Sequence, residues 1–387
     1  MPIPLSYSYR NLLARRLTSF LTAAGMALVV FVFAAVLMLA EGLRQTLVAT
    51  GSFDNAIVLR AGSETEVQSA LARAQAAIVT AQPEIAMGPE GLLVASEAMV
   101  LVNLPKRGTN RPANVMIRGV QPTSFALRRE VRLSEGRWFR PGSNELVAGA
   151  QIARRFKGAG LGEELRFAMR TWRIVGVFDA GNTGFASEIW GDVEQLLQAF
   201  RRTAYSSVIL RLRDPLAFAG LKARLESDPR LPVQVRREVE FYEAQSRRLA
   251  DFIRLLGVVL TAIFGLGAVL GAMVTMYAQV GTRIAEIGTL RALGFPRHDI
   301  LLAFLLEAGL LGMAGWLIGL LPAGLLNFFT LSTVNWASFA ELTFRFTLTP
   351  GIVLKSLAFG VGMGLLGGLL PAIKAARLPL LEALKAP

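Results

Sequence analysis

Cysteine, histidine and charge are all scarce in this sequence of 387 residues. The chain contains no cysteine, which excludes disulfides and thiolate metal sites. Its one histidine, His298, excludes a Ser-His-Asp triad or a histidine-ligated metal site within residues 42–254. Asp, Glu, Lys and Arg make up 18% of the residues, against roughly 25% in ordinary soluble domains. The composition therefore points away from a soluble protein.

Long apolar runs occupy the places where charge is missing. Residues 18–40, 255–282, 308–340 and 356–373 contain no Asp, Glu, Lys or Arg. Runs of about 18 or more such residues predict membrane-spanning helices. The third run is too long for one helix, so we expect a span at 300–327 and a short outer loop at 328–351. The first run exceeds the roughly 7–15-residue apolar core of a signal peptide, and no clear cleavage site follows, so we expect a permanent anchor.

The segment between the first two spans has the composition of a folded domain. Residues 42–254 are long enough for one large domain or two small ones. Apolar periodicity predicts helices at 63–81, 192–201 and 216–226, and strands at 92–102, 114–120, 145–148, 172–178, 207–213 and 232–239. Ser63 and Glu66 have the spacing of a capping box at the start of the first helix. We expect helical stalks at 41–50 and 240–254.

Basic residues are unevenly distributed about the predicted spans. Short loops rich in Lys and Arg face the cytoplasm. The loop at 327–351 carries Arg345 alone, whereas the other flanks carry Arg10, Arg15, Arg16, Arg283, Arg291, Arg297, Lys374, Arg377 and Lys385. With four spans, this pattern places both termini inside and the large domain outside. The net charge of +13 is compatible with basic helix ends that meet anionic lipid, and no basic patch with interleaved aromatics indicates nucleic acid.

The sequence contains no evident catalytic or cofactor site. A P-loop needs Gly-Lys followed by Ser or Thr, and no lysine in this sequence follows a glycine. The paired acids Glu163 and Glu164 are typical of a solvated surface. We therefore expect no metal, no directly bound cofactor and no ATPase activity in this chain.

Three motifs, in the same order, resemble those of the FtsX-like permease family, which includes MacB-type and lipoprotein-releasing ABC permeases. RNLLARRLTSFLTAAGMALVV begins at Arg10, RIAEIGTLRALGFPRHDI begins at Arg283, and GLLGGLLPAIKAARLPLLEALK begins at Gly364. LSEGRWF, NELVAGAQIARRF and WRIVGVFD are similar to the family's periplasmic core. The resemblance covers almost the whole chain. The fold class that it implies is an α-helical membrane protein with four transmembrane helices plus a large mixed α/β periplasmic domain inserted between helices 1 and 2.

The resemblance also implies a domain plan. Cytoplasmic parts are an amphipathic helix at 1–17, a coupling-helix loop at 283–299 and a tail at 375–387. The first span and stalk are expected at 18–50, and the MacB-like core domain at 51–239. A second stalk and span follow at 240–282, then the third span at 300–327, the short periplasmic loop at 328–351 and the fourth span at 352–374.

Residues 283–293 look like the family's coupling helix, which inserts into a cleft on a separate ATPase subunit. The pattern itself suits a protein groove, because apolar residues alternate with charges, but it suits a solvated turn equally well. Arg283 and Glu286 can pair across one helical turn. Pro296 prevents the helix from continuing, and a glycine can end it. The residues assigned to ATPase coupling are Arg283, Ile284, Glu286, Ile287, Leu290, Arg291, Leu293 and Gly294.

Two further features lie within the predicted spans. Glu307 falls about two turns into the third span, where an acid faces the bundle interior and marks a function or a partner. The resemblance favours a structural or coupling role, and the plainer alternative is a contact with Arg15 or Arg16. The second feature is a four-residue glycine repeat that permits close packing, either within the bundle or between two copies: Gly360, Gly364 and Gly368.

The resemblance implies a permease subunit of an ABC transporter. A separate cytoplasmic ATPase dimer, with its ATP and Mg, would drive export or extraction of a lipid, lipoprotein, peptide or other amphiphile. The alternative is a mechanotransmitting scaffold that regulates a periplasmic partner such as a cell-wall hydrolase. Other expected partners are a second copy or homologous permease, a periplasmic adaptor and membrane lipids. The expected location is the bacterial inner membrane.

Overall fold

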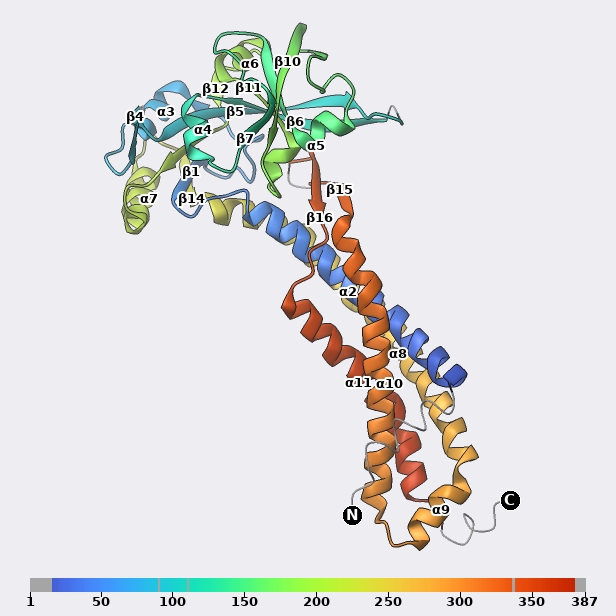
Figure 1. Ribbon diagram of the computed structural model, residues 1–387. Helices are drawn as coiled ribbons and strands as arrows, with labels where there is room; N and C mark the ends of the chain where they lie inside the picture. Colours follow the sequence, from blue (N-terminus) through green and yellow to red (C-terminus); the bar gives the residue numbers. More distant parts are fainter. Residues whose placement is uncertain (1–15, 90, 110, 336–337, 380–387) are drawn as a thin grey trace. The chain divides into compact units, whose positions relative to one another are not determined.

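The computed structural model describes residues 16–379, apart from positions 90, 110 and 336–337. The helix expected at 1–17 and the last part of the tail expected at 375–387 lie outside the described residues. The chain forms two compact units (Figure 1). The helical unit comprises Met1–Glu41, Phe252–Phe329 and Phe346–Pro387, and the globular unit comprises Gly42–Asp251 and Thr330–Arg345.

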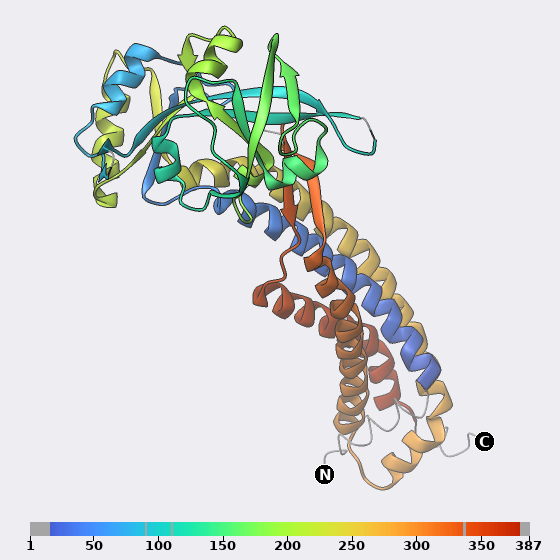
Figure 2. The ribbon, with the colours of Figure 1, turned by 45° about the horizontal axis from the view of Figure 1, so that its top comes forward.

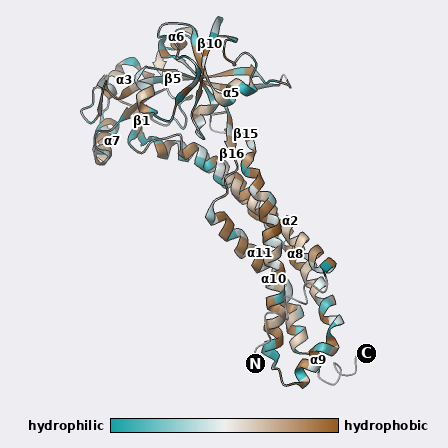
Figure 3. Cartoon of the chain, viewed as in Figure 1, coloured by the Kyte–Doolittle hydropathy of each residue, from teal (hydrophilic) through white to brown (hydrophobic). Residues whose placement is uncertain are grey.

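Among the described residues, four helices are long and apolar enough to cross a membrane: α2 (Arg16–Val48), α8 (Glu238–Thr282), α10 (Arg297–Leu325) and α11 (Pro350–Ala376). Hydrophobic residues predominate along them in Figure 3. They confirm the predicted spans. Because α2 extends to Val48 and α8 begins at Glu238, the segments expected as helical stalks are helical over these residues. A short helix, α9 (Ile284–Ala292), follows α8, and a 3-10 turn, η3 (Leu326–Phe328), follows α10.

Glycines allow the helices of the helical unit to approach closely. A Cβ added at Gly312 on α10 would overlap the carbonyl oxygen of Gly360 on α11. A Cβ at Gly319 would overlap the carbonyl oxygen of Ala27 on α2. Within the helical unit, α2 and α8 lie side by side in both ribbon views (Figures 1 and 2). Small residues at these crossings provide the backbone contact that holds membrane helices together where lipid removes the hydrophobic driving force.

A ten-stranded mixed sheet organises the globular unit, in the order β14-β1-β13-β5-β6-β11-β8-β10-β7, with β9 paired to β10. Of the pairs of adjacent strands, β6 with β11 and β8 with β10 are parallel, and the others are antiparallel. The strands are β1 (Asn55–Arg60), β5 (Val94–Pro105), β6 (Pro112–Val120), β7 (Arg132–Gly136), β8 (Glu145–Gly149), β9 (Glu164–Phe167), β10 (Arg170–Asp179), β11 (Glu188–Asp192), β13 (Ser207–Arg211) and β14 (Val233–Arg237).

Short helices and two-residue ladders cover this sheet and enclose two apolar cores. One core surrounds Val58 and Val208, and the other surrounds Phe156 and Trp172. The helices are α3 (Arg73–Thr80), α4 (Thr123–Leu127), α5 (Ala150–Arg155), α6 (Val193–Ala199) and α7 (Phe218–Ser227), with the 3-10 turns η1 (Gly184–Ser187) and η2 (Pro215–Ala217). The ladders pair β2 (Leu71–Ala72) with β12 (Ala204–Tyr205) and β3 (Met87–Gly88) with β4 (Gly91–Leu92).

The helix expected at 63–81 is wrong for its first half, since only α3 (Arg73–Thr80) is helical there. The carboxylate of Glu66 accepts a hydrogen bond from Arg118 at 2.8 Å. The hydroxyl of Ser69 accepts one from the backbone N–H of Arg60 at 3.0 Å. These tertiary contacts hold the segment out of a helix, because Glu66 cannot both cap a helix and reach the sheet. The strands expected from periodicity correspond to β5, β6, β8, β10, β13 and β14.

The short loop expected at 328–351 contains a β-hairpin. β15 (Thr330–Val334) and β16 (Glu341–Arg345) pair antiparallel, with Thr330 opposite Arg345 and Val334 opposite Glu341. The hairpin lies between the third and fourth membrane helices in the sequence, yet it packs as part of the globular unit. The side chains from Glu341 to Phe344 are buried there.

Candidate functional site

The predicted coupling segment forms a separate short helix with a defined end. At the C-terminus of α9, the N–H of Gly294 donates to the carbonyl of Arg291 at 3.1 Å, and the N–H of Phe295 donates to that of Leu290 at 3.2 Å. This pair of bonds is the Schellman motif, which needs a left-handed residue, and Gly294 supplies it with φ of +95°. Pro296 then precedes the first residue of α10. The expected end of the helix at Gly294 is confirmed.

The structure brings two predicted site residues, Arg283 and Glu307, into direct contact. Arg283 precedes α9 and is buried, with 7% of its side chain exposed. Its Nη1 donates to the Glu307 carboxylate on α10 at 2.9 Å, and its Nε donates to Glu286 at 2.9 Å. The guanidinium also lies 4.9 Å from the ring centre of Phe304. A buried charge whose partner is removed is strongly destabilising, so this contact fixes the start of α9 on α10.

The apolar residues assigned to coupling do not share one exposed face. Ile287 is buried at 2% exposure in a cluster with Ile300 and Phe304. Leu293, by contrast, is 72% exposed. Ile284, Glu286, Leu290 and Arg291 are partly exposed. Ile287 therefore anchors α9 to its own bundle, and the others remain as candidate contacts for a partner.

The three glycines of the predicted repeat all face α10 of the same chain. A Cβ at Gly364 or Gly368 would overlap Ala308, and one at Gly360 would come within 3.0 Å of the Trp316 Cβ. These glycines therefore permit the close crossing of α10 and α11 within one bundle.

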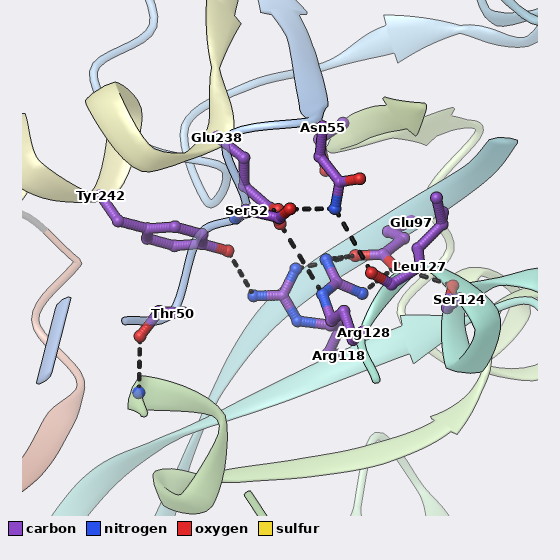
Figure 4. A network of polar contacts seen from close by, with 12 residues as sticks. Thr50, Ser52, Asn55, Glu97, Arg118, Ser124, Leu127, Arg128, Glu238 and Tyr242 are labelled. Carbon is purple, nitrogen blue, oxygen red and sulfur yellow. Dashed lines mark hydrogen bonds and ion pairs between the residues drawn. The ribbon is translucent and has the colours of Figure 1, made fainter. Parts of the chain in front are cut away.

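A network of buried charges lies in the globular unit, and sequence reasoning missed it. Arg118 on β6 is fully buried. Its guanidinium donates to the carboxylates of Glu66, Glu97 and Glu188, in each case at a closest distance of 2.8 Å. The hydroxyl of Tyr242, on α8, lies 3.4 Å from the same guanidinium (Figure 4). One arginine thus joins the segment before α3, two strands and the beginning of α8.

A second buried arginine, Arg128, extends the network. It donates both terminal nitrogens to Glu97, at 2.8 Å for Nη2. Its Nε lies 3.9 Å from the carboxylate of Glu238. Burial alone would raise the pKa of Glu97, but Arg128 and Arg118 outweigh burial and lower that pKa to about 2. Glu97 is therefore ionised at any physiological pH.

Glu238, the first residue of α8, joins that helix to the chain that leaves α2. Its carboxylate accepts hydrogen bonds from the backbone N–H of Ser52 at 3.0 Å and from Asn55 Nδ2 at 2.8 Å (Figure 4). A Cβ at Gly51 would come within 2.6 Å of the Glu238 backbone. Burial raises the pKa of Glu238 above its ordinary value. Both chain segments that enter the globular unit from the first two membrane helices therefore meet at one polar node.

A signal for this network was present in the sequence. Glu97 interrupts the apolar run VASEAMVLV, and Arg118 interrupts NVMIRGV. A charge within a buried strand predicts an oppositely charged partner, because charged residues are almost never fully buried unless paired. The sequence does not reveal which residues pair, since Glu66, Glu188 and Glu238 come from distant segments. Among the described residues, no group of three or more His, Cys, Asp or Glu could hold a metal ion.

Four membrane-spanning helices, with a mixed α/β domain between the first and second, define a membrane protein with a large extramembranous domain. The profile of the MacB-like periplasmic core domain matches residues 19–228, and that of the FtsX-like permease C-terminal region matches residues 258–380. The chain therefore belongs to the MacB-like ABC transporter permease family.

Several proteins are similar to parts of this chain. The macrolide export ATP-binding/permease protein MacB of Bdellovibrio bacteriovorus is 26% identical over 298 residues, which cover 71% of this chain and 44% of the relative. MacB 1/2 of Paracoccus denitrificans is 27% identical over 405 residues, covering 96% of this chain and 57% of the relative. The chain thus spans about half the length of these relatives. The periplasmic region of MacB from Actinobacillus actinomycetemcomitans is 14% identical, with a TM-score of 0.37, covering 51% of this chain and 94% of that structure.

Proposed function

We propose that this chain is the membrane subunit of an ABC transporter that turns ATP hydrolysis by a cytoplasmic ATPase into motion of a periplasmic domain. The moved substrate is an amphiphile such as a lipid, lipoprotein or peptide. In this proposal, both termini and α9 lie in the cytoplasm, and the globular unit lies in the periplasm of a bacterial inner membrane. The basic residues that flank α9 and the chain ends support that orientation.

The ATPase is a separate dimeric subunit in this proposal. MacB relatives carry ATP binding and permease functions under one name. The matched parts of the present chain lie in the periplasmic and permease regions, and its sequence has no lysine after a glycine and thus no Walker A motif. Two permease chains, identical or homologous, would then be moved by two ATPase subunits.

The observation that carries the proposal is the attachment of α9 to α10. The buried Arg283–Glu307 pair and the buried Ile287 fix one side of α9 to the bundle. Arg291, near the end of the nine-residue α9, is partly exposed, and Leu293, directly after it, is exposed. A helix held in this way transmits a push from a partner to α10, because it cannot slide on the bundle without breaking a buried ion pair.

The test measures how much the purified permease stimulates its ATPase in lipid nanodiscs. We expect Glu286→Ala and Arg291→Glu to lower this stimulation several-fold while the thermal unfolding midpoint stays unchanged. Arg213→Glu, at an exposed position of the globular unit, is the charge-reversal control and should retain full stimulation. Wild-type stimulation in both α9 variants would remove these side chains from coupling. Copurification of a cell-wall hydrolase in place of an amphiphile would favour the scaffold alternative.

A further inference from the structure

The β15–β16 hairpin is joined to the membrane helices by very little chain. η3 ends at Phe328 and β15 begins at Thr330, so the single residue Phe329 separates them. β16 ends at Arg345 and α11 begins at Pro350, which leaves residues 346–349 as the second connection. An extended residue spans at most about 3.6 Å. A displacement of α10 larger than a few ångströms along the chain direction must therefore also displace the hairpin.

Glu341, at the first position of β16, is the centre of the hairpin's attachment to the globular unit. Its side chain is buried at 4% exposure. Lys106 Nζ, just after β5, lies 2.5 Å from one carboxylate oxygen, and Arg155 Nη2, at the end of α5, lies 2.7 Å from the other. Each cation is about 30% exposed, at 30% for Lys106 and 31% for Arg155. The carboxylate thus sits between two cations, neither of which belongs to the hairpin.

Arg155 holds both strands of the hairpin. Besides Glu341, it donates to the hydroxyl of Thr343 on β16 at 2.8 Å and to that of Ser332 on β15 at 2.5 Å. The backbone N–H of Thr343 donates in turn to the hydroxyl of Ser187 in η1 at 3.1 Å. The side-chain amide of Asn114 on β6 donates to the backbone carbonyl of Phe339 at 3.2 Å. The hairpin is thereby bonded to three separate elements of the globular unit.

The apolar side chains of β16 complete this attachment. Leu342 is 5% exposed and Phe344 is 3% exposed. Releasing the hairpin would expose both side chains to water and would separate Glu341 from two cations at once. Since release would expose these apolar side chains to water and would break every hydrogen bond and ion pair described above, the hairpin is built to remain attached.

We infer that this hairpin is a permanent mechanical link, with Glu341 as the positioning residue, through which α10 and α11 act on the globular unit. The inference rests on the proposed function, because it assigns a route for the motion that the ATPase generates. The globular unit then receives motion through the hairpin as well as through α2 and α8. The opposite arrangement is a hairpin that detaches in each cycle. A disulfide that holds the hairpin in place would stop a detaching hairpin but would leave a permanent link active.

The experiment follows the distance between the two units by fluorescence energy transfer during ATP turnover, in the full complex in nanodiscs. Click-reactive amino acids at Met169 (98% exposed) and at Arg377, an exposed residue directly after α11, carry the dyes. We expect a nucleotide-dependent change in transfer for the wild type. Glu341→Arg, which places a third cation beside Lys106 and Arg155, should lose at least half of this change while ATP hydrolysis stays within two-fold of wild type.

Two further variants separate a linking role from general damage. Arg345→Glu reverses a charge at the exposed end of the same strand and should leave the change in transfer intact. A disulfide between Ser187→Cys and Thr343→Cys uses positions already joined by a hydrogen bond, in a chain with no other cysteine. This lock should leave the wild-type background fully active and should restore the change in the Glu341→Arg background. Glu341→Gln, measured with thermal unfolding, covers the case in which the arginine variant does not fold.

Each outcome decides between the arrangements. A full change in transfer for folded Glu341→Arg or Glu341→Gln would overturn the link. So would a disulfide that stalls ATP hydrolysis in the wild-type background, because the hairpin would then have to detach in every cycle. The proposed function, and this inference with it, would be overturned by a wild-type complex in which nucleotide does not change energy transfer and the permease does not stimulate ATP hydrolysis.

Discussion

Replacing Arg118 by methionine should destabilise the globular unit strongly, and acid should partly reverse the loss. Arg118 is fully buried and binds Glu66, Glu97 and Glu188. In the variant, Glu97 keeps Arg128 as its partner, but Glu66 and Glu188 lose their only arginine among the described contacts. Their remaining donors are neutral, for example the indole N–H of Trp190 for Glu188 at 2.8 Å. Two carboxylates are thus left buried without a counter-charge.

The size of the effect follows from what those carboxylates can do instead. Breaking a buried ion pair by removing one partner costs about 3–5 kcal/mol. Protonation limits this loss, because neutralising an ordinary glutamate at pH 7 costs about 3–4 kcal/mol at about 1.4 kcal/mol per pH unit. Because Glu66 and Glu188 are both affected, we expect the free energy of unfolding to fall by about 3–7 kcal/mol at pH 7 and by roughly half of that at pH 5.5. For a domain of this size, the lower figure already lowers Tm by at least about 6 °C.

The sign of the pH dependence distinguishes the variant from the wild type. The pKa of Glu97 is lowered to about 2 from an ordinary value of 4.5, so its stabilising contribution is complete above pH 4.5 and is lost as pH falls towards 2. Acidification from pH 7 to 5.5 therefore leaves the stabilising contribution of Glu97 unchanged. Glu238 has a raised pKa, so it gives both proteins the same gain on acidification. Any additional gain in stability on acidification of the Arg118→Met variant therefore comes from the carboxylates that lost their arginine partner.

The assay is thermal unfolding of the detergent-purified chain, followed by tryptophan fluorescence at pH 7 and 5.5. Hydrogen exchange on β6 and β11 assigns the transition to the globular unit. Arg132→Met, at an exposed position on β7, is the matched control and should change stability by less than about 0.5 kcal/mol. An Arg118→Met protein as stable as this control, or one that loses stability between pH 7 and 5.5, would refute the reasoning.

Two remaining predictions concern glycines of the helical unit. Gly364→Ala should lower the Tm of this unit, because overpacking against Ala308 costs about 1–3 kcal/mol, whereas Gly362→Ala on the same helix meets no atom within 4 Å and should not; equal Tm values for the two variants in detergent would contradict the packing. Gly294→Ala should reduce ATPase stimulation, because its φ of +95° costs other residues about 1–3 kcal/mol and the end of α9 would shift. Gly281→Ala, also in open space, is the control, and an equal reduction there would contradict a role for the left-handed turn.

The helical unit was predictable because its signals are local. A charge-free run long enough to cross a membrane leaves the chain one choice, since every backbone group must be bonded within a helix. The end of α9 was equally readable, because Gly294 and Pro296 act on the backbone within a few residues of themselves. The strands with clear alternation, such as β10 (Arg170–Asp179) with Trp172 and Ile174 facing inward, were found for the same reason.

The failures have a common cause, which is a polar residue whose partner is distant in the sequence. Glu66 has the spacing of a capping box but pairs instead with Arg118, 52 positions away. Glu341 lies in a segment that had the length of a simple loop, yet Arg155, 186 positions earlier in the chain, binds it. Local propensity is a weak prior where a tertiary contact of a charged group competes with it. No window of sequence contains both members of either pair.

Buried ion pairs also explain how parts of this chain can move as units without being exceptionally stable. Such pairs add little net stability compared with apolar packing, but they penalise every displaced geometry severely, because displacement leaves a buried charge alone. Arg283–Glu307 fixes α9 on α10 in this way, and Arg155–Glu341 fixes the hairpin. The buried carboxylate of Glu238 joins the start of α8 to Asn55 by a hydrogen bond. The proposed function needs junctions of this kind, since an apolar contact can slide with little loss of buried area while a paired charge cannot. We therefore expect substitutions at these junctions to separate ATP hydrolysis from motion more sharply than substitutions in the apolar cores, which should impair both together.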